Sequence, residues 1–335
     1  MKQLLTGLVL AAAFATTAHA VLPPAPVLSA QTDADGKALP FGRRAWQPND
    51  TPLGTGLFKA VMFADPSLPA HVIYAPANLD QAGKRPVIVW GNGACINAGN
   101  RFRAFLTDLA SHGFLVIASG VMAPATMEVG AQENPRVPQP NDPPPPPRDP
   151  AALPPPPPPT TAAQMTEALD WAVSQNAKVG GRFQNRVAVA NMAAFGQSCG
   201  GSQAMAIAGD PRLKALGIFG SGVRMVNGMP DPSGVAAVHT PLLLIHGDQA
   251  RDVAFNGARA TFEAVGNVPV VEAWHDALHH IGTWGQENGG ANGEIGVAWA
   301  LWRLKGDKQA AKMFKGADCE LCMSPGWHVS KKQID

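Results

Sequence analysis

The sequence predicts an α/β fold with a mostly parallel central sheet and helices on both faces. Short, wholly apolar runs such as 86–90 and 114–118 are typical of strands buried on both sides. They alternate with segments of helical periodicity, for example 101–111 and 161–175. Strands that alternate with helices favour a parallel sheet covered by helices. No internal repeat is visible. The length allows one large domain or two small ones, and we expect one domain over 57–335.

The start of the chain has the pattern of a signal peptide. A lysine precedes an apolar run over 4–15, and Ala18-His19-Ala20 forms a small-x-small cleavage site. The run is shorter than the roughly 20 residues that cross a bilayer, so a membrane anchor is disfavoured. We therefore expect cleavage after Ala20 and a secreted or periplasmic protein, with an irregular arm rich in Pro, Ala and Asp over 21–56.

Local patterns predict each element of the domain in turn. Segments 57–63 and 70–74 form an antiparallel hairpin around Asp65-Pro66-Ser67, and the first buried strand, helix and second strand follow. The proline tract in the insertion at 134–160 predicts extended backbone, either an exposed insertion or a lid. The remaining expected elements are a helix at 161–175, a strand ending at Phe195, a helix to Ala208, strands at 215–219, 242–245 and 268–273, a helix at 294–304 and a segment near 308–314.

Charge and cysteine content restrict the partners and the compartment. Lys and Arg total 26 against 25 for Asp and Glu, so no field attracts nucleic acid or an anionic membrane. Neutral small molecules or polymers are the expected partners, and the oligomeric state stays open. Four cysteines in an exported chain favour disulfides. Cys319 and Cys322 form one Cys-x-x-Cys without a second, which disfavours structural zinc. Cys95 and Cys199 are expected on the same face of the sheet, which allows a second bond without fixing the connectivity.

The stretch Phe-Gly-Gln-Ser-Cys-Gly-Gly at 195–201 is the most informative motif. Ser198 lies between Gly196 and Gly200, after an apolar strand and before a helix-forming segment. This G-x-S-x-G pattern predicts a sharp strand-to-helix turn that exposes the serine hydroxyl as a nucleophile. The amide of Cys199, at the helix start, is a candidate donor to an oxyanion, while its side chain is expected to point into the fold.

A serine becomes nucleophilic only beside a base, and the base needs a carboxylate that fixes its tautomer. In this strand-helix order the acid and then the histidine should follow the serine along the chain. Of Asp248 and Asp252, we expect Asp252 to be the acid, because the loop must first leave the sheet, whereas Asp248 suits a turn cap.

Three histidines follow the strand at 268–273: His275, His279 and His280. His280 is the expected base, because the turn at Gly282-Thr283 can present its imidazole. The spacing of His275 and His279 would suit a metal on a helix face, but no third ligand has a matching spacing. No metal and no cofactor are therefore expected.

The loop after the strand at 86–90 should supply the second oxyanion donor. The backbone amides of Asn92 and Gly93 are the candidates, beside that of Cys199. Three aromatic residues near the inferred site are candidates for an acyl or aryl pocket, with plain core packing as the alternative: Trp90, Phe255 and Trp284.

Taken together, the motifs around Trp90-Gly91-Asn92-Gly93, Ser198, Asp252 and His280 resemble bacterial exported α/β-hydrolases related to dienelactone hydrolases and cutinase-like polyester hydrolases. The resemblance covers roughly 57–330 and implies an α/β-hydrolase fold and a serine carboxylic-ester hydrolase. It implies Ser198 as nucleophile, Asp252 as acid, His280 as base and Asn92 as oxyanion donor.

The chain departs from the pattern of both families. Polyester hydrolases usually carry Met after the serine and an aromatic residue in the oxyanion loop, where this chain has Cys199 and Asn92. Dienelactone hydrolases use a cysteine in place of Ser198. Ester hydrolysis is the leading hypothesis. The alternatives are a cutinase-like (PET-type) polyester hydrolase, a peptidase or amidase on the same triad, and a non-catalytic binding protein of the same fold.

Overall fold

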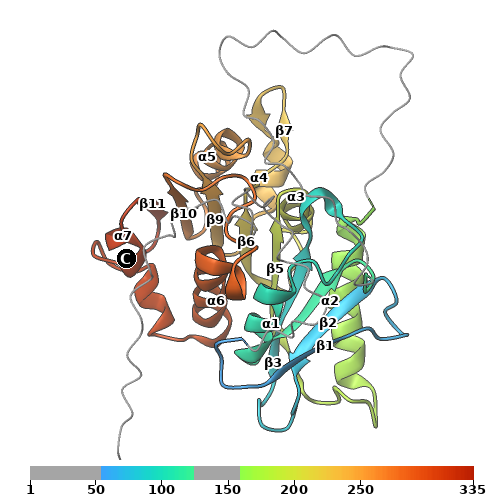
Figure 1. The fold of residues 1–335 in the computed structure, drawn as a ribbon. Helices are drawn as coiled ribbons and strands as arrows, with labels where there is room; N and C mark the ends of the chain where they lie inside the picture. Colours follow the sequence, from blue (N-terminus) through green and yellow to red (C-terminus); the bar gives the residue numbers. More distant parts are fainter. Residues whose placement is uncertain (1–53, 124–158) are drawn as a thin grey trace, which may run out of the picture.

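The structure is a computed structural model that describes residues 54–123 and 159–335 (Figure 1). Its main feature is a nine-stranded sheet. The strands are β1 (Ala60–Phe63), β2 (His71–Pro76), β3 (Arg85–Gly91), β4 (Leu115–Ser119), β5 (Val187–Gln197), β6 (Leu213–Phe219), β9 (Leu242–Gly247), β10 (Val270–His275) and β11 (Trp327–Lys332). Their order across the sheet is β1-β2-β4-β3-β5-β6-β9-β10-β11.

The centre of this sheet is parallel and its edges are antiparallel. Every neighbouring pair from β4 to β10 runs parallel, whereas β1 pairs antiparallel with β2, β2 with β4, and β10 with β11. β2, β3, β4 and β9 are buried along their whole length, as expected for strands covered on both faces. The predicted mixed α/β fold with a mostly parallel central sheet is confirmed.

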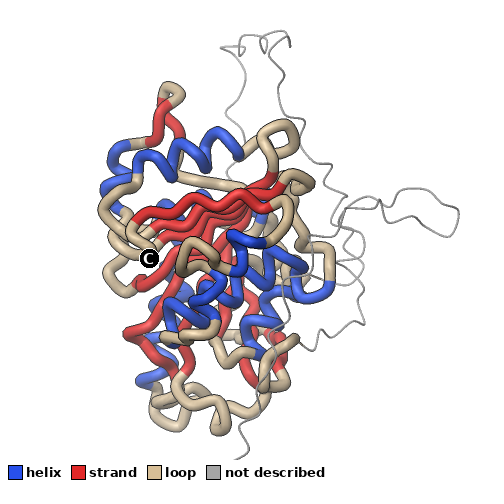
Figure 2. Tube along the Cα trace, turned by 90° about the vertical axis from the view of Figure 1, so that its left-hand side faces the viewer, coloured by secondary structure: helices blue, strands red, loops and turns tan. Residues whose placement is uncertain are grey.

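Helices form a layer on each face of the sheet, and Figure 2 shows the strands between them. The helices are α1 (Arg103–Ser111), α2 (Ala162–Ala177), α3 (Cys199–Ala206), α4 (Pro232–Ala237), α5 (Phe255–Ala264), α6 (Gly290–Lys305), α7 (Glu320–Met323) and the 3-10 turns η2 (Gly93–Cys95), η3 (Glu287–Gly289) and η4 (Ala310–Met313). Apolar residues of α1 and α6 share one core with one face of the sheet, and those of α2, α3 and α5 share a second core with the other face.

Most predicted elements are present, with shifts at their ends. The N-terminal hairpin is β1 and β2, and the segment near 308–314 is η4. Elements that were not predicted from the sequence include α5, the edge strand β11 and a small hairpin formed by β7 (Met225–Val226) and β8 (Met229–Pro230). The signal peptide, most of the irregular arm and the proline tract lie outside the described residues. Among the helices in the described ranges, none is long and apolar enough to span a membrane.

This topology places three predicted site residues at one edge of the sheet. β5, β9 and β10 are parallel members of the sheet, with β6 between β5 and β9. Ser198 follows β5, Asp252 follows β9 and His280 follows β10. The carboxyl ends of parallel strands lie at the same edge, so the loops that carry these side chains can meet.

Candidate active site

Ser198 lies in the sharp turn between β5 and α3. Its backbone has φ 52° and ψ −121°, a conformation that non-glycine residues rarely adopt and that costs on the order of 1–3 kcal/mol. The turn is held from both sides, because the Ser198 amide donates to the Phe219 carbonyl at 2.8 Å and its carbonyl accepts from the Ser202 amide at 3.0 Å. The hydroxyl is thereby fixed at the start of α3.

The glycines of the motif are required by close backbone contacts. A Cβ on Gly196 would lie 2.3 Å from the carbonyl oxygen of Gly200. A Cβ on Gly200 would lie 2.0 Å from the carbonyl carbon of Gly91, in the loop that leaves β3. Both distances are far below van der Waals contact, so neither position can carry a side chain without a shift of the backbone. The turn and the loop after β3 are thus packed directly against each other.

Ser198, His280 and Asp252 form a continuous chain of hydrogen bonds. The Ser198 Oγ lies 2.8 Å from His280 Nε2, and His280 Nδ1 lies 2.7 Å from Asp252 Oδ1. An ionised carboxylate can only accept, so Nδ1 carries the hydrogen and leaves Nε2 free to accept from the serine hydroxyl. The His280 side chain is 11% exposed and that of Asp252 is 0% exposed. The imidazole therefore borders solvent while the carboxylate behind it does not.

Three donors surround the Asp252 carboxylate. Oδ1 also accepts from the Ala254 amide, and Oδ2 accepts from the Gly247 amide, both at 2.7 Å. Burial acts to raise the pKa of Asp252, but the hydrogen bond and charge of His280 and the two amide bonds together lower that pKa below its ordinary value. Asp252 is consequently held as an anion against the imidazole.

The alternative residues have other partners. Asp248 Oδ1 accepts from the Ala250 amide at 2.9 Å and caps the turn after β9. His275, at the end of β10, accepts from the Ala277 amide through Nδ1 and lies 3.2 Å from the Pro325 carbonyl through Nε2. Burial lowers the pKa of His275 and of the half-buried His279. No group of three or more His, Cys, Asp or Glu in the described ranges is arranged to hold a metal ion.

Backbone amides are the available oxyanion donors. The Asn92 side chain is buried and donates to the carbonyls of Ile96, Ala98 and Ser119, so both of its hydrogens are engaged. Asn92 can therefore donate to an oxyanion only through its backbone amide. The alternative donor in this loop is the amide of Gly93, the first residue of η2. Cys199 is the first residue of α3, and amides at a helix start have no acceptor one turn earlier. The amides of Asn92, Gly93 and Cys199 lie beside the contact between the turn at Ser198 and the loop after β3.

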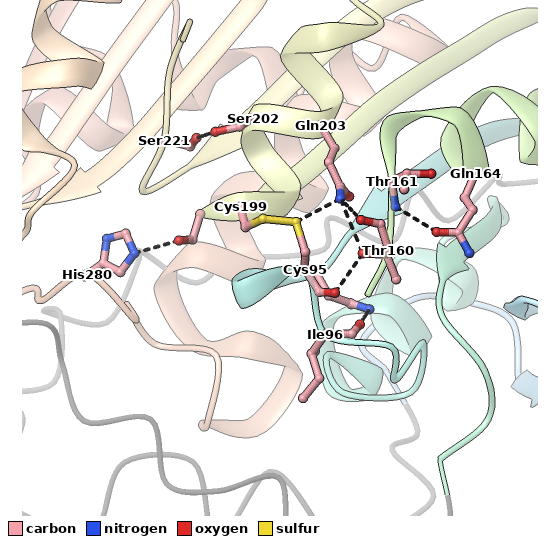
Figure 3. Close-up of a disulfide and its surroundings, with 12 residues drawn as sticks. Cys95, Ile96, Thr160, Thr161, Gln164, Cys199, Ser202, Gln203, Ser221 and His280 are labelled. Carbon is pink, nitrogen blue, oxygen red and sulfur yellow. Dashed lines mark hydrogen bonds between the residues drawn. A yellow bond between two sulfur atoms is a disulfide. The ribbon is translucent and has the colours of Figure 1, made fainter. Parts of the chain in front are cut away.

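Both cysteine pairs form disulfides. Cys95 bonds to Cys199 with a Cα–Cα distance of 5.3 Å, and Cys319 bonds to Cys322 with a Cα–Cα distance of 4.9 Å (the first is drawn in Figure 3). The expectation of disulfides is confirmed, including the bond between Cys95 and Cys199 that the fold allowed. Disulfides persist in oxidising compartments, so the two bonds fit an extracellular protein.

The three aromatic candidates for a substrate pocket lie in two places. Trp90 is fully buried, and Trp284 is 6% exposed. Their rings lie 5.6 Å apart in a cluster that also includes Phe102, Phe105 and Phe219. Trp90 thus packs in the core and presents no surface to a substrate. Phe255 is half-buried, with ring contacts to His246 and Trp274.

Two residues outside the predicted set contact His280. The Gln197 side chain donates to the His280 carbonyl at 3.2 Å. Gly220, which follows β6 with φ 55°, lies so close to His280 that a Cβ would be 3.1 Å from its carbonyl oxygen and 3.3 Å from Nδ1. The only available signals were that Gln197 precedes the serine and that a glycine follows a predicted strand.

A cluster of ionisable side chains lies beside the acid. His246, in β9, contacts the Glu272 carboxylate in β10 at 3.0 Å, and both side chains are 0% exposed. Arg259 of α5 pairs with the other oxygen of Glu272. Because His246 directly precedes Gly247, whose amide binds Asp252, this cluster fixes the strand end that supports the acid.

The fold and the site define an α/β protein with a hydrogen-bonded serine, histidine and aspartate at the carboxyl edge of a mostly parallel sheet. The chain matches no protein-family model and no curated protein.

Proposed function

We propose that the protein has an α/β-hydrolase fold and is a carboxylic-ester hydrolase that works through a covalent acyl-enzyme. The observation that carries this proposal is the hydrogen-bond chain from the Ser198 Oγ through His280 to Asp252. The strained backbone of Ser198 adds support, since strained residues cluster at functional sites. Such a chain converts a weakly nucleophilic hydroxyl into a reactive one.

Acylation begins when the Ser198 Oγ attacks the ester carbonyl carbon and His280 Nε2 takes the hydroxyl proton. The carbonyl oxygen becomes an oxyanion that accepts hydrogen bonds from the amide of Cys199 and from that of Asn92 or Gly93. The tetrahedral intermediate then expels the alcohol, which receives the proton from His280 Nε2. Asp252 stays ionised and stabilises the imidazolium throughout.

Deacylation repeats these steps with water. His280 takes a proton from a water molecule whose oxygen attacks the acyl carbon, and a second oxyanion forms at the same amides. Its collapse breaks the bond to the Ser198 Oγ, which regains the proton from His280. The carboxylic acid leaves, and no cofactor takes part in any step.

The two disulfides support an exported protein. We propose that the mature chain is secreted or periplasmic, with its leader removed after Ala20. The near-balance of charges favours neutral ester substrates, either small or polymeric.

A serine-directed fluorophosphonate probe and a panel of p-nitrophenyl esters test the proposal. Ser198→Ala should abolish labelling and lower turnover by on the order of 10⁶ with the fold intact. Ser202→Ala is the matched control, because this exposed hydroxyl lies one helical turn away and contacts Ser221 at 3.0 Å. It should keep both labelling and turnover.

Matched ester and anilide substrates separate an esterase from an amidase. Cleavage of a p-nitrophenyl ester without measurable cleavage of the matching anilide is expected from an esterase, and turnover of the anilide indicates an amidase. Soluble products released from a polyester film would extend the substrates to polymers. Wild-type protein that neither reacts with the probe nor cleaves any ester contradicts the proposal.

A further inference from the structure

One of the disulfides joins the two halves of the proposed oxyanion hole. Cys199 directly follows the proposed nucleophile and carries one candidate donor amide. Cys95 ends the η2 turn, which begins at Gly93 directly after Asn92, and these two residues carry the other candidate donors. The bond connects residues 104 positions apart in the sequence. Figure 3 shows it between the start of α3 and the loop after β3, close to His280.

The loop that carries Cys95 has an unfavourable backbone. Ala94 has φ 54° and Cys95 has φ 49°, both in the left-handed region where a Cβ is disfavoured. Two consecutive residues of this kind hold their conformation only when the surroundings impose it. Within the loop, the Cys95 amide donates to the Asn92 carbonyl at 3.1 Å. The disulfide adds a covalent restraint from outside the loop.

The bond is also held by its neighbours. The Gln203 side chain in α3 donates to Cys95 Sγ at 2.8 Å and to the Thr160 carbonyl at 2.6 Å. Thr160, just before α2, donates to the Cys95 carbonyl through both its amide and its hydroxyl, each at 3.0 Å (Figure 3). Cys95 itself is 1% exposed. The sulfur atoms therefore belong to a fixed network between α3, the loop and the start of α2.

We propose that the disulfide between Cys95 and Cys199 is a positioning element of the oxyanion hole, which holds the donor amides of the two loops at a set separation before substrate binds. This inference rests on the proposed function. Oxyanion donors act on charge that develops in the transition state and contribute little to binding the ground state. Loss of the restraint should therefore lower kcat and leave KM nearly unchanged.

The double variant Cys95→Ala/Cys199→Ala tests this. Loss of one whole oxyanion donor costs about 10² to 10³ in kcat, and a displaced donor costs less, so we expect a fall of roughly 10- to 100-fold. KM should stay within about threefold. Inhibition by a trifluoromethyl ketone, which mimics the tetrahedral intermediate, should weaken by the same factor as kcat/KM falls. Ser198 should still react with the fluorophosphonate probe.

A second double variant, Cys95→Gly/Cys199→Ala, provides a rescue. Glycine adopts φ 49° without the Cβ penalty, so the loop should keep its conformation more often without the disulfide. Removal of one such penalty corresponds to about a fivefold gain. We expect kcat to recover by about that factor relative to Cys95→Ala/Cys199→Ala. A merely structural bond predicts no such difference between two folded variants.

Removal of the other disulfide, by Cys319→Ala/Cys322→Ala, is the matched control and should leave kcat and KM at wild-type values. Circular dichroism at the assay temperature restricts the comparison to folded protein. If Cys95→Ala/Cys199→Ala does not fold, the same comparison is made between Cys95→Gly/Cys199→Ala and wild type.

Wild-type kcat in the folded variant, with only a lower unfolding temperature, would overturn the inference and leave the proposed function standing. Failure of the proposed function has a different result, because wild-type protein would then cleave no ester and Ser198 would not be labelled.

Discussion

Asp252→Asn is the sharpest test of the acid, because it removes one acceptor and keeps the shape of the side chain. In the structure, Oδ1 accepts from His280 Nδ1 and the Ala254 amide, while Oδ2 accepts from the Gly247 amide. Asparagine has one oxygen for these two places. If its NH₂ group faces Gly247, two donors oppose each other in a buried site, at a cost of about 1–3 kcal/mol.

The other orientation disables the base. If the NH₂ group faces His280, the ring must accept at Nδ1 and carry its hydrogen on Nε2, which can then no longer take the Ser198 proton. We expect kcat to fall by about 10⁴, which corresponds to about 5 kcal/mol of transition-state stabilisation. Turnover of a p-nitrophenyl ester near pH 8 measures the change, and chemical denaturation shows whether the variant is folded.

Asp248→Asn is the matched control. Its side chain caps a turn through Oδ1, a contact that the asparagine oxygen can keep, so kcat should stay within about twofold. A nearly unchanged kcat for Asp252→Asn together with a large loss for Asp248→Asn would refute the assignment of the acid.

Two further predictions concern stability. Glu272→Gln removes the carboxylate that buried His246 and half-buried Arg259 share and leaves Arg259 with Glu263 as its carboxylate partner, so the free energy of unfolding measured in urea should fall by about 1–3 kcal/mol; an unchanged value would show that the cluster does not stabilise the fold. Burial and two neighbouring carboxylates raise the pKa of Glu294 to about 7, so the folded state favours the protonated form and loses stability as the pH rises from about 4.5 through 7. Glu294→Gln should exceed wild type by about 1–2 kcal/mol at pH 8, allowing for solvent screening, and equal it at pH 4; an equal difference at both pH values would argue against this titration.

The sequence predicted the buried centre of the sheet well, and the reason is physical. A strand such as β3 or β4 is covered on both faces, so its apolar run is a sufficient signal. β11 is an edge strand with one buried residue, Trp327, and its pairing with β10 depends on contacts far along the chain. In α5, Phe255, Ala258 and Phe262 do follow helical spacing, but Gly257 and the nearby loop weaken that pattern.

The site residues also divide into those that the sequence indicates and those that depend on contacts in the folded sheet. Ser198 follows from a local motif, and Asp252 and His280 follow from the order of elements along the chain. Gln197 and Gly220 could not be predicted, because their contacts with His280 depend on where β6 lies beside β5 in the folded sheet. The disulfide from Cys95 to Cys199 was compatible with the sequence but not fixed by it, since four cysteines allow three connectivities.

The distribution of left-handed backbone argues for a functional centre at this place. Of the seven non-glycine residues with positive φ in the described ranges, three are asparagines, which tolerate that conformation. Apart from Gln333, the others are Ala94, Cys95 and Ser198, and all three lie in the turn of the nucleophile or in the loop bonded to it. The side chains of Ala and Cys, unlike that of Asn, make no local hydrogen bond that offsets the cost of a left-handed backbone. Such conflicts between local preference and fold are expected where geometry serves a reaction, which supports the proposal that the disulfide and Ser198 are parts of one preorganised site.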